Sequence, residues 1–141
     1  MRFTHFGAAL HYDVQANMNP HHRFLVVDDY SPMRDVVRRL LEELGYQHVH
    51  EASDGIAALS LLQSLPFDLV ITDWNMPRMA GLDLLKAVRS DPRLAHLPVL
   101  MVTAEVKREQ IIAATQAGVN GYIIKPFTAV ALAEKVAKLL G

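Results

Sequence analysis

The sequence contains no cysteine, which excludes disulfide bonds, thiolate metal sites and cysteine nucleophiles. It also lacks a long apolar run, since none approaches the roughly 18 residues that suggest a membrane-spanning helix. Net charge is scarce as well: the formal value is −1. Nucleic acid and anionic membranes are therefore not expected partners. The absence of cysteine fits a reducing compartment, and we expect a cytoplasmic protein.

The length of 141 residues is enough for one domain with a single core. Hydrophobic residues make up 51% and charged residues 21%, which is ordinary for a soluble globular protein. Residues 1–22 contain only a very short apolar stretch interrupted by polar residues, so they do not match a secretory signal. We interpret them as an N-terminal extension, either flexible or an added leader, and expect the folded domain to span residues 23–141.

Short apolar runs alternate with amphipathic stretches from residue 23 onward. Four of the runs are continuous, as in strands buried on both faces: 24–27, 69–72, 99–103 and 122–124. Residues 48–52 alternate in polarity instead and are expected near a sheet edge. Helical periodicity covers 31–44, 54–65, 81–91, 107–117 and 128–140. This five-fold alternation predicts an α/β fold, (βα)5, with a doubly wound parallel five-stranded sheet covered by helices on both sides.

Capping residues support several of these boundaries. Ser31 is predicted to be the N-cap of its helix, with Pro32 at the first helical position. Gly45 and Gly118 suit the C-terminal ends of two helices, and Thr128 is predicted to cap the last one.

Polar residues follow the predicted strands at their carboxyl ends, which is where parallel sheets build their sites. A single such residue would mean little, but five of them share this edge: Asp28, Asp29, Asp73, Thr103 and Lys125. Three crowded carboxylates raise one another's pKa unless a cation compensates their charge. A hard divalent ion such as Mg²⁺, which takes oxygen ligands, is the natural solution.

The same residues favour phosphoryl chemistry. A carboxylate beside Mg²⁺ and an ammonium group is well placed as a nucleophile toward a phosphoryl group, because both cations offset its charge. Thr103 could donate a hydrogen bond to a phosphoryl oxygen. Neither G-x-G-x-x-G nor G-x-x-x-x-G-K-[ST] follows any predicted strand, so dinucleotide and P-loop nucleotide binding are not indicated.

Several longer segments resemble the receiver domain of two-component response regulators: FLVVDD, TDWNMPRMAGLDLLK, PVLMVTAE, IIAATQAG and GYIIKPF. The resemblance extends from Phe24 to about Leu140, and it is greatest to the single-domain chemotaxis regulators. It implies the strand order 2-1-3-4-5 of flavodoxin-like sheets. Ala80 departs from the pattern, because many relatives carry an acidic residue there. We expect a modest effect of Ala80 on its loop and unchanged chemistry.

The resemblance implies a role for each matching residue at the site. Asp73 would be the phosphoacceptor, and Thr103 and Lys125 would contact the phosphoryl group. The ligands of Mg²⁺ would be the carboxylates of Asp28, Asp29 and Asp73 and the backbone carbonyl of Asn75.

Further implied roles concern the lifetime of the phosphoryl group and the switch. Asn75 and Glu105 would tune dephosphorylation, Tyr122 would reorient when Thr103 moves, and the Lys125–Pro126 peptide bond would be cis. The face that binds partners would comprise Val106, Lys107, Arg108, Ile111, Tyr122 and Lys135.

The implied function is signalling, not substrate turnover by an enzyme. A histidine kinase of the chemotaxis type would be the donor, the flagellar motor switch the leading target and a phosphatase a further candidate partner of a monomeric protein. Because the chain ends at Gly141, directly after the last predicted helix, we expect output through protein contact. A stand-alone receiver that serves as a phosphorelay intermediate or phosphate sink has the same site and stays open as an alternative.

A Mg²⁺-dependent phosphohydrolase with an aspartyl-phosphate intermediate is a more distant alternative. Enzymes of the haloacid dehalogenase type use D-x-D, in which the second aspartate is the general acid. Asn75 stands at that position here and cannot exchange a proton in this role.

Overall fold

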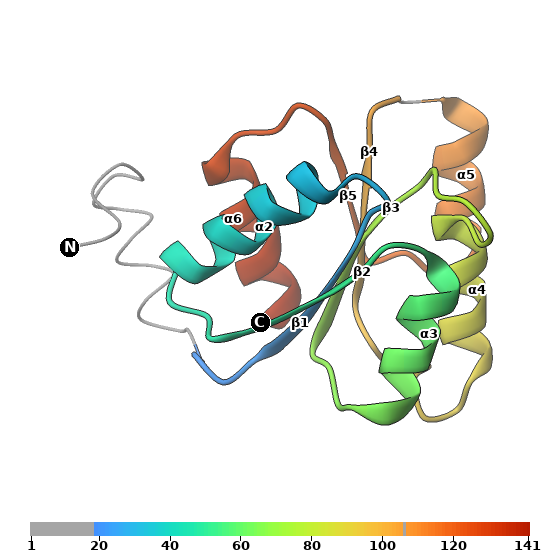
Figure 1. Ribbon diagram of the computed structural model, residues 1–141. Coiled ribbons are helices and arrows are strands. Elements are labelled where there is room, and N and C mark those ends of the chain that lie inside the picture. Colours follow the sequence, from blue (N-terminus) through green and yellow to red (C-terminus); the bar gives the residue numbers. More distant parts are fainter. Residues whose placement is uncertain (1–18, 106) are drawn as a thin grey trace.

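The computed structural model describes residues 19–105 and 107–141, in which strands and helices alternate (Figure 1). The strands are β1 (Arg23–Val27), β2 (His48–Ala52), β3 (Leu69–Asp73), β4 (Val99–Thr103) and β5 (Gly121–Ile124). The helices are α2 (Ser31–Glu43), α3 (Gly55–Ser64), α4 (Gly81–Ser90), α5 (Arg108–Gln116) and α6 (Ala129–Leu140). Among these residues no helix has both the length and the apolar character needed to cross a membrane.

The five strands form one parallel sheet in the order β2-β1-β3-β4-β5. This confirms the predicted strand order and the predicted edge position of residues 48–52. The chain runs from β1 outward to β2 and then returns to place β3 on the other side of β1. The order therefore reverses between β1 and β3, where α/β sheets open a crevice at the carboxyl ends of their strands.

Helices cover the sheet on both faces, as Figure 1 shows: α2 and α6 lie on one side, and α3, α4 and α5 lie on the other. Each strand contributes alternate side chains to two cores, because successive residues of a strand point to opposite faces. Phe24 and Val26 of β1 pack in the core beneath α2 and α6. Leu25 and Val27 pack in the core beneath the other three helices. The continuous apolar runs of the sequence thus follow from burial on both faces.

The helix ends agree with the capping signals except at α2. Gly45 and Gly118 have φ values of 105° and 90° after their helices, and the hydroxyl of Thr128 accepts a hydrogen bond from the amide of Ala131 at 3.0 Å. The prediction that Ser31 caps α2 is wrong. Tyr30 is the N-cap, without a side-chain bond, because its carbonyl accepts the first amide bonds of the helix and Ser31 already lies inside it.

The expected N-terminal extension lies largely outside the described residues, which begin at Asn19. Residues 19–22 precede β1, and the carbonyl of Pro20 accepts a hydrogen bond from the amide of Gln47 at 3.2 Å. These last four residues of the extension are therefore tied to the segment between α2 and β2.

Candidate functional site

The carboxyl ends of β1 and β3 bring three aspartates together. Asp28 and Asp73 are buried and Asp29 is exposed, and each offers a carboxylate oxygen within 4.8 Å of the others. Asp28 continues the line of β1, since its amide donates to the carbonyl of Ala52 at 3.1 Å. The parallel register of two adjacent strands therefore creates the cluster that the sequence predicted.

Lys125 supplies a positive charge to this cluster from the end of β5. Its ammonium nitrogen lies 3.1 Å from Oδ2 of Asp28 and 3.4 Å from Oδ1 of Asp73. The amide of Lys125 donates to the carbonyl of Thr103 at 2.7 Å, which fixes the backbone from which the side chain starts. The Lys125–Pro126 peptide bond is cis, as the resemblance implied.

Asp73 has a disturbed protonation equilibrium. Burial raises the pKa of its carboxyl group above the usual value, the nearby Lys125 ammonium opposes this rise, and the Asp28 carboxylate adds to it. The amide of Trp74 donates to Oδ1 of Asp73 at 2.9 Å and also favours the charged form. Burial is the largest cause, so the Lys125 ammonium only partly offsets the cost of ionising Asp73.

The residues present fit a hard divalent cation. The donor set consists of carboxylate oxygens, which Mg²⁺ and Ca²⁺ prefer. Next to it lies an open hollow of about 420 Å³, lined by Asp29, Asn75, Met76, Pro77 and Ala80. Mg²⁺ usually keeps several water molecules, and this hollow leaves room for them. The three aspartates and the segment around Asn75 are therefore the residues that would hold the ion.

Thr103 lies at the end of β4 and is fully buried. Its hydroxyl donates to the carbonyl of Glu105 at 3.2 Å and accepts from the amide of Glu105 at 3.3 Å. The hydroxyl is thus engaged with the following loop. A hydrogen bond from Thr103 to a group on Asp73 would require it to give up at least the bond to the Glu105 carbonyl.

Tyr122 packs against the core beneath α3, α4 and α5. Its hydroxyl is buried and makes no hydrogen bond within the described part of the chain. Burial raises the pKa of Tyr122, and the neighbouring Thr103 side chain opposes the rise. The residue is half-buried overall with its hydroxyl directed inward, and the reorientation that the resemblance implies stays a prediction.

The residues expected on the partner face lie at α5, β5 and α6. Four of them are exposed, namely Lys107, Arg108, Ile111 and Lys135. Tyr122 is half-buried, and Val106 lies outside the described residues. Glu105, the expected tuning residue, pairs with Lys107 at 3.3 Å, but both side chains are more than half exposed. Such a pair contributes little to stability.

Sequence reasoning missed two arginines near the site. Arg34 donates to the carbonyl of Asp28 at 2.6 Å and to Glu51 at 2.9 Å, so it supports the segment that carries the first two aspartates. Its place in the first turn of the helix after Asp28 was the available signal. Arg78 pairs with the buried Asp54 across two loops. Nothing in the local sequence pattern indicates that contact.

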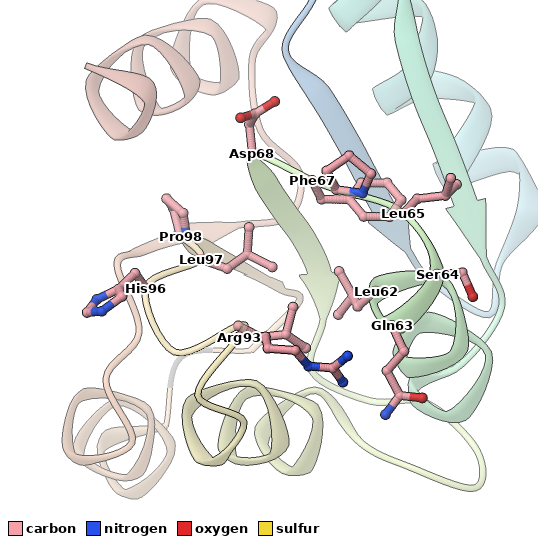
Figure 2. Close-up of a pocket in the computed structure, with 12 residues that line it drawn as sticks. Leu62, Gln63, Ser64, Leu65, Phe67, Asp68, Arg93, His96, Leu97 and Pro98 are labelled. Carbon is pink, nitrogen blue, oxygen red and sulfur yellow. The ribbon is translucent and has the colours of Figure 1, made fainter.

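A second hollow, of about 520 Å³, lies at the opposite, amino-terminal edge of the sheet (Figure 2). The segments before β3 and β4 line it, with apolar side chains such as Leu62, Phe67 and Leu97. The only group of three metal-ligating side chains found in the described residues is the aspartate cluster, so this hollow holds none.

Comparison with known proteins gives a family match over residues 24–137, to the response regulator receiver domain. Chemotaxis protein CheY-3 of Vibrio cholerae is 57% identical over 126 residues, which cover 89% of this chain and 97% of that protein. Chemotaxis protein CheY of Pseudomonas aeruginosa is 60% identical over 117 residues, or 83% of this chain and 94% of that protein.

Solved structures agree with the sequence matches. The chemotaxis protein CheY4 of Vibrio cholerae, crystallised at low pH, superposes with a TM-score of 0.80 at 34% identity, over 84% of this chain and 98% of that one. A CheY-like receiver domain protein from Methanospirillum hungatei gives 0.80 at 29% identity, over 85% and 94%. The chain therefore belongs to the response regulator receiver domain family and, within it, to the CheY-like chemotaxis regulators.

Proposed function

We propose that the protein is a single-domain response regulator that a histidine kinase phosphorylates on Asp73 in a Mg²⁺-dependent reaction. One observation carries this proposal. Asp28, Asp29 and Asp73 offer oxygens within 4.8 Å of one another, and Lys125 lies within 3.4 Å of two of these carboxylates. Three carboxylates beside one ammonium group leave an excess of negative charge, which favours binding of a cation. Such an arrangement is typical of a functional site.

In the proposed reaction an oxygen of Asp73 forms a bond to the phosphorus of a phosphohistidine. The phosphorus–nitrogen bond breaks, and the imidazole nitrogen keeps the electron pair and takes a proton from water. Mg²⁺, when bound by Asp28, Asp29, Asp73 and the Asn75 carbonyl, supplies positive charge at the phosphoryl oxygens.

Lys125 has two tasks in this proposal. Before transfer its ammonium group favours the ionised, nucleophilic form of Asp73. After transfer the phosphoryl group adds roughly −1.5 to −2 charge, so the ammonium follows the charge to a phosphoryl oxygen. Thr103 rotates its hydroxyl from the Glu105 carbonyl toward the same group and donates a hydrogen bond to it.

The switch is a shift between two populations. The hydroxyl of Tyr122 is buried in this structure, so the fold accommodates an inner ring position. Phosphorylation would draw the Thr103 side chain toward Asp73. The space that Thr103 leaves would then be open to the Tyr122 ring, and the inner position of the ring would be stabilised. A change in population of an existing state is sufficient for such a switch.

The output is contact with a protein that binds the face formed by α5, β5 and α6. The exposed Lys107, Arg108 and Lys135, together with the exposed Ile111, suit an amphipathic partner segment with acidic residues. Because the relatives are chemotaxis proteins, we propose the flagellar motor switch as the target and a chemotaxis kinase as the donor. A phosphatase would reset a protein that acts as a cytoplasmic monomer.

The first experiment follows Trp74, which is only 8% exposed and adjoins Asp73. Its fluorescence is recorded as Mg²⁺ and then acetyl phosphate are added, and intact mass is measured on the same samples. We expect a Mg²⁺-dependent change, and then a second change with one phosphoryl group gained by the wild type but not by Asp73→Asn. Wild-type protein that gains no phosphoryl mass at saturating Mg²⁺ contradicts the proposal.

A second experiment tests the output. The phosphorylated protein should bind a motor-switch peptide, and Tyr122→Ala should weaken that binding while phosphorylation proceeds. Binding and phosphorylation that both survive Tyr122→Ala would remove the aromatic step. Failure to bind the peptide, with transfer of the phosphoryl group to a histidine phosphotransfer domain, would favour the relay alternative. Multiple turnover of small phosphate esters would favour the phosphohydrolase.

A further inference from the structure

The loop between β3 and α4, residues 74–80, is closed tightly at its base. The amide of Gly81 donates to the carbonyl of Trp74 at 2.8 Å. A Cβ atom at position 81 would lie 2.2 Å from the carbonyl oxygen of Asp73, so only glycine allows this approach. The base of the loop is thereby pressed against the backbone of the proposed phosphoacceptor.

The tip of the same loop is held by an ion pair. Arg78 donates from Nε to Oδ2 of Asp54 at 2.8 Å, and its Nη2 donates to the same oxygen. Arg78 has a φ of 65°, and it is the one non-glycine residue with positive φ in residues 19–105 and 107–141. Arginine seldom adopts a positive φ, which costs conformational energy, so a contact that compensates this cost is expected.

Asp54 is a firm anchor for this pair. It is 4% exposed, and its other oxygen accepts a hydrogen bond from the amide of Ala57 at 2.9 Å, which caps α3. The Ala57 amide and then Arg78 hold the pKa of Asp54 below its usual value. The two oxygens of one carboxylate thus join the start of α3 to the tip of the loop.

An apolar contact lies beside the ion pair. A Cβ atom at Gly55 would come within 2.6 Å of the side chain of Met79, so Met79 rests directly on the backbone at the start of α3. We use the name loop latch for the Arg78–Asp54 ion pair and the Met79–Gly55 contact together. Consecutive residues of the loop tip therefore meet consecutive residues of α3 and its cap.

We propose that Arg78 is a positioning residue for the metal site, acting through the loop latch. This inference rests on the proposed function, because it concerns the affinity for Mg²⁺ at that site. Asn75 lies three residues before Arg78 in the segment that lines the hollow beside Asp29. With base and tip both fixed, the Asn75 carbonyl has little freedom left, and Mg²⁺ need not order the loop when it binds.

Ala80, at the end of the loop, can form no ion pair. Arg78 reaches across to Asp54, so the loop gains an ionic contact from a neighbouring element. The carboxylate that holds the loop, Asp54, thereby lies outside the proposed set of Mg²⁺ ligands and does not compete with those ligands for the ion.

Two single variants separate the latch from its surroundings. Arg78→Gly removes the side chain and suits the positive φ. Asp54→Asn removes the charge but retains an oxygen for the Ala57 amide. In a Trp74 fluorescence titration, each should raise the Mg²⁺ concentration at half-saturation about five-fold, as expected for one partly exposed ion pair. Arg78→Lys, which keeps the charge and loses the planar fork, should recover part of the affinity.

The double variant and a matched control complete the experiment. Arg78→Gly with Asp54→Asn should bind Mg²⁺ no more weakly than either single variant, because both remove one interaction. Arg93→Ala removes an exposed pair with Asp91 at 3.3 Å near the opposite edge, and it should leave the titration unchanged. Urea unfolding of every variant is measured in parallel.

The outcomes distinguish the two proposals. Single variants that bind Mg²⁺ like the wild type, or effects that add in the double variant, overturn the latch while the wild type still gains its phosphoryl group. Loss of Mg²⁺ affinity in proportion to a fall in the urea midpoint also overturns it, because the role is then only structural. If no protein responds to Mg²⁺, including the wild type, the proposed function fails and the latch proposal fails with it.

Discussion

The two edges of the sheet carry hollows of comparable size and different chemistry. The hollow at the amino-terminal edge, about 520 Å³, is lined by both apolar and polar side chains, and its charged or titratable ones, Asp68, Arg93 and His96, form no cluster of like charge (Figure 2). The hollow at the carboxyl edge, about 420 Å³, adjoins a cluster of three aspartates and Lys125. This cluster includes Asp73, and burial raises the pKa of its carboxyl group.

The way that charge is compensated at each edge sharpens the contrast. Arg89, at the amino-terminal edge, donates to the carbonyl of Gly118 at 2.8 and 3.0 Å and to the carbonyl of Leu97 at 2.7 Å. Its charge is met by oxygens of the fold. At the carboxyl edge the carboxylates exceed the cations that the chain supplies. A hollow alone therefore does not mark a site, whereas charge that the fold leaves uncompensated does.

The largest effect is expected from Arg89→Ala. The substitution leaves carbonyls of two loops without their donor, so the free energy of unfolding should fall by about 3 kcal/mol. Urea unfolding measures this fall, and Lys86→Ala on the exposed side of α4 is the matched control. The Mg²⁺ titration of the folded protein should not change. If it does, the two edges are coupled and the comparison fails.

Asp28→Asn should have the next largest effect, at the other edge. Asparagine can still accept from the Tyr30 amide, which lies 2.9 Å from Oδ1 of Asp28, so the fold should be retained. The affinity for Mg²⁺ should fall at least about ten-fold, or roughly 1.4 kcal/mol, because one ligand charge is lost. Calorimetric titration with Mg²⁺ measures this change. An unchanged affinity would mean that the aspartate cluster does not bind the ion.

Glu51 links acid stability to the carboxyl edge through Arg34. Burial alone would raise the pKa of Glu51, but hydrogen bonds from Arg38 and Arg34 outweigh it and lower the pKa. A group whose pKa is lowered on folding stabilises the fold at pH values above its pKa in the unfolded state. This stabilisation is lost as the pH falls through its pKa in the folded state. Between neutral pH and about pH 3, the wild type should lose about 1 kcal/mol more stability than Glu51→Gln.

Unfolding by urea at several pH values tests this difference. At neutral pH Glu51→Gln should be the less stable protein, and the two curves should converge in acid. Parallel curves at all pH values would show that the pair of arginines does not sense the charge of Glu51.

His96→Ala should have the smallest effect. The exposed side chain lines the hollow at the amino-terminal edge, opposite the aspartate cluster. Stability should change by less than about 0.5 kcal/mol, and phosphorylation by acetyl phosphate should keep its rate. Intact mass against time measures that rate. A change of several-fold would assign a role to the hollow that its chemistry does not indicate.

Much of the fold followed from the sequence because strands buried on both faces leave a distinct pattern. The runs around Phe24 and Ile71 are apolar without alternation, and the polar residues that end them meet at one edge because the sheet is parallel. Glycines also placed two helix ends correctly, since their φ values are positive. These signals are local in the chain or follow from topology alone.

The residues that were missed depend on contacts between distant segments. Arg78 and Asp54 are separated by 24 positions, and a positive φ at an arginine has no signature in the sequence. Ser31 was misplaced as a cap because the carbonyl of Tyr30, not the serine hydroxyl, takes the first amide bonds of α2. The burial of the Tyr122 hydroxyl depends on packing between distant segments, which a sequence pattern does not encode.

The two outer strands of the sheet differ in how they resist aggregation. An unpaired strand edge can pair with another chain unless charge, a bulge or a short length prevents it. β2 carries His50 and Glu51, both engaged with arginines, whereas β5 is four residues long and ends at Ile124, which is 46% exposed. Brevity is thus the main protection of β5. A partner seated on this side would also shield the edge that is most open to polymerisation.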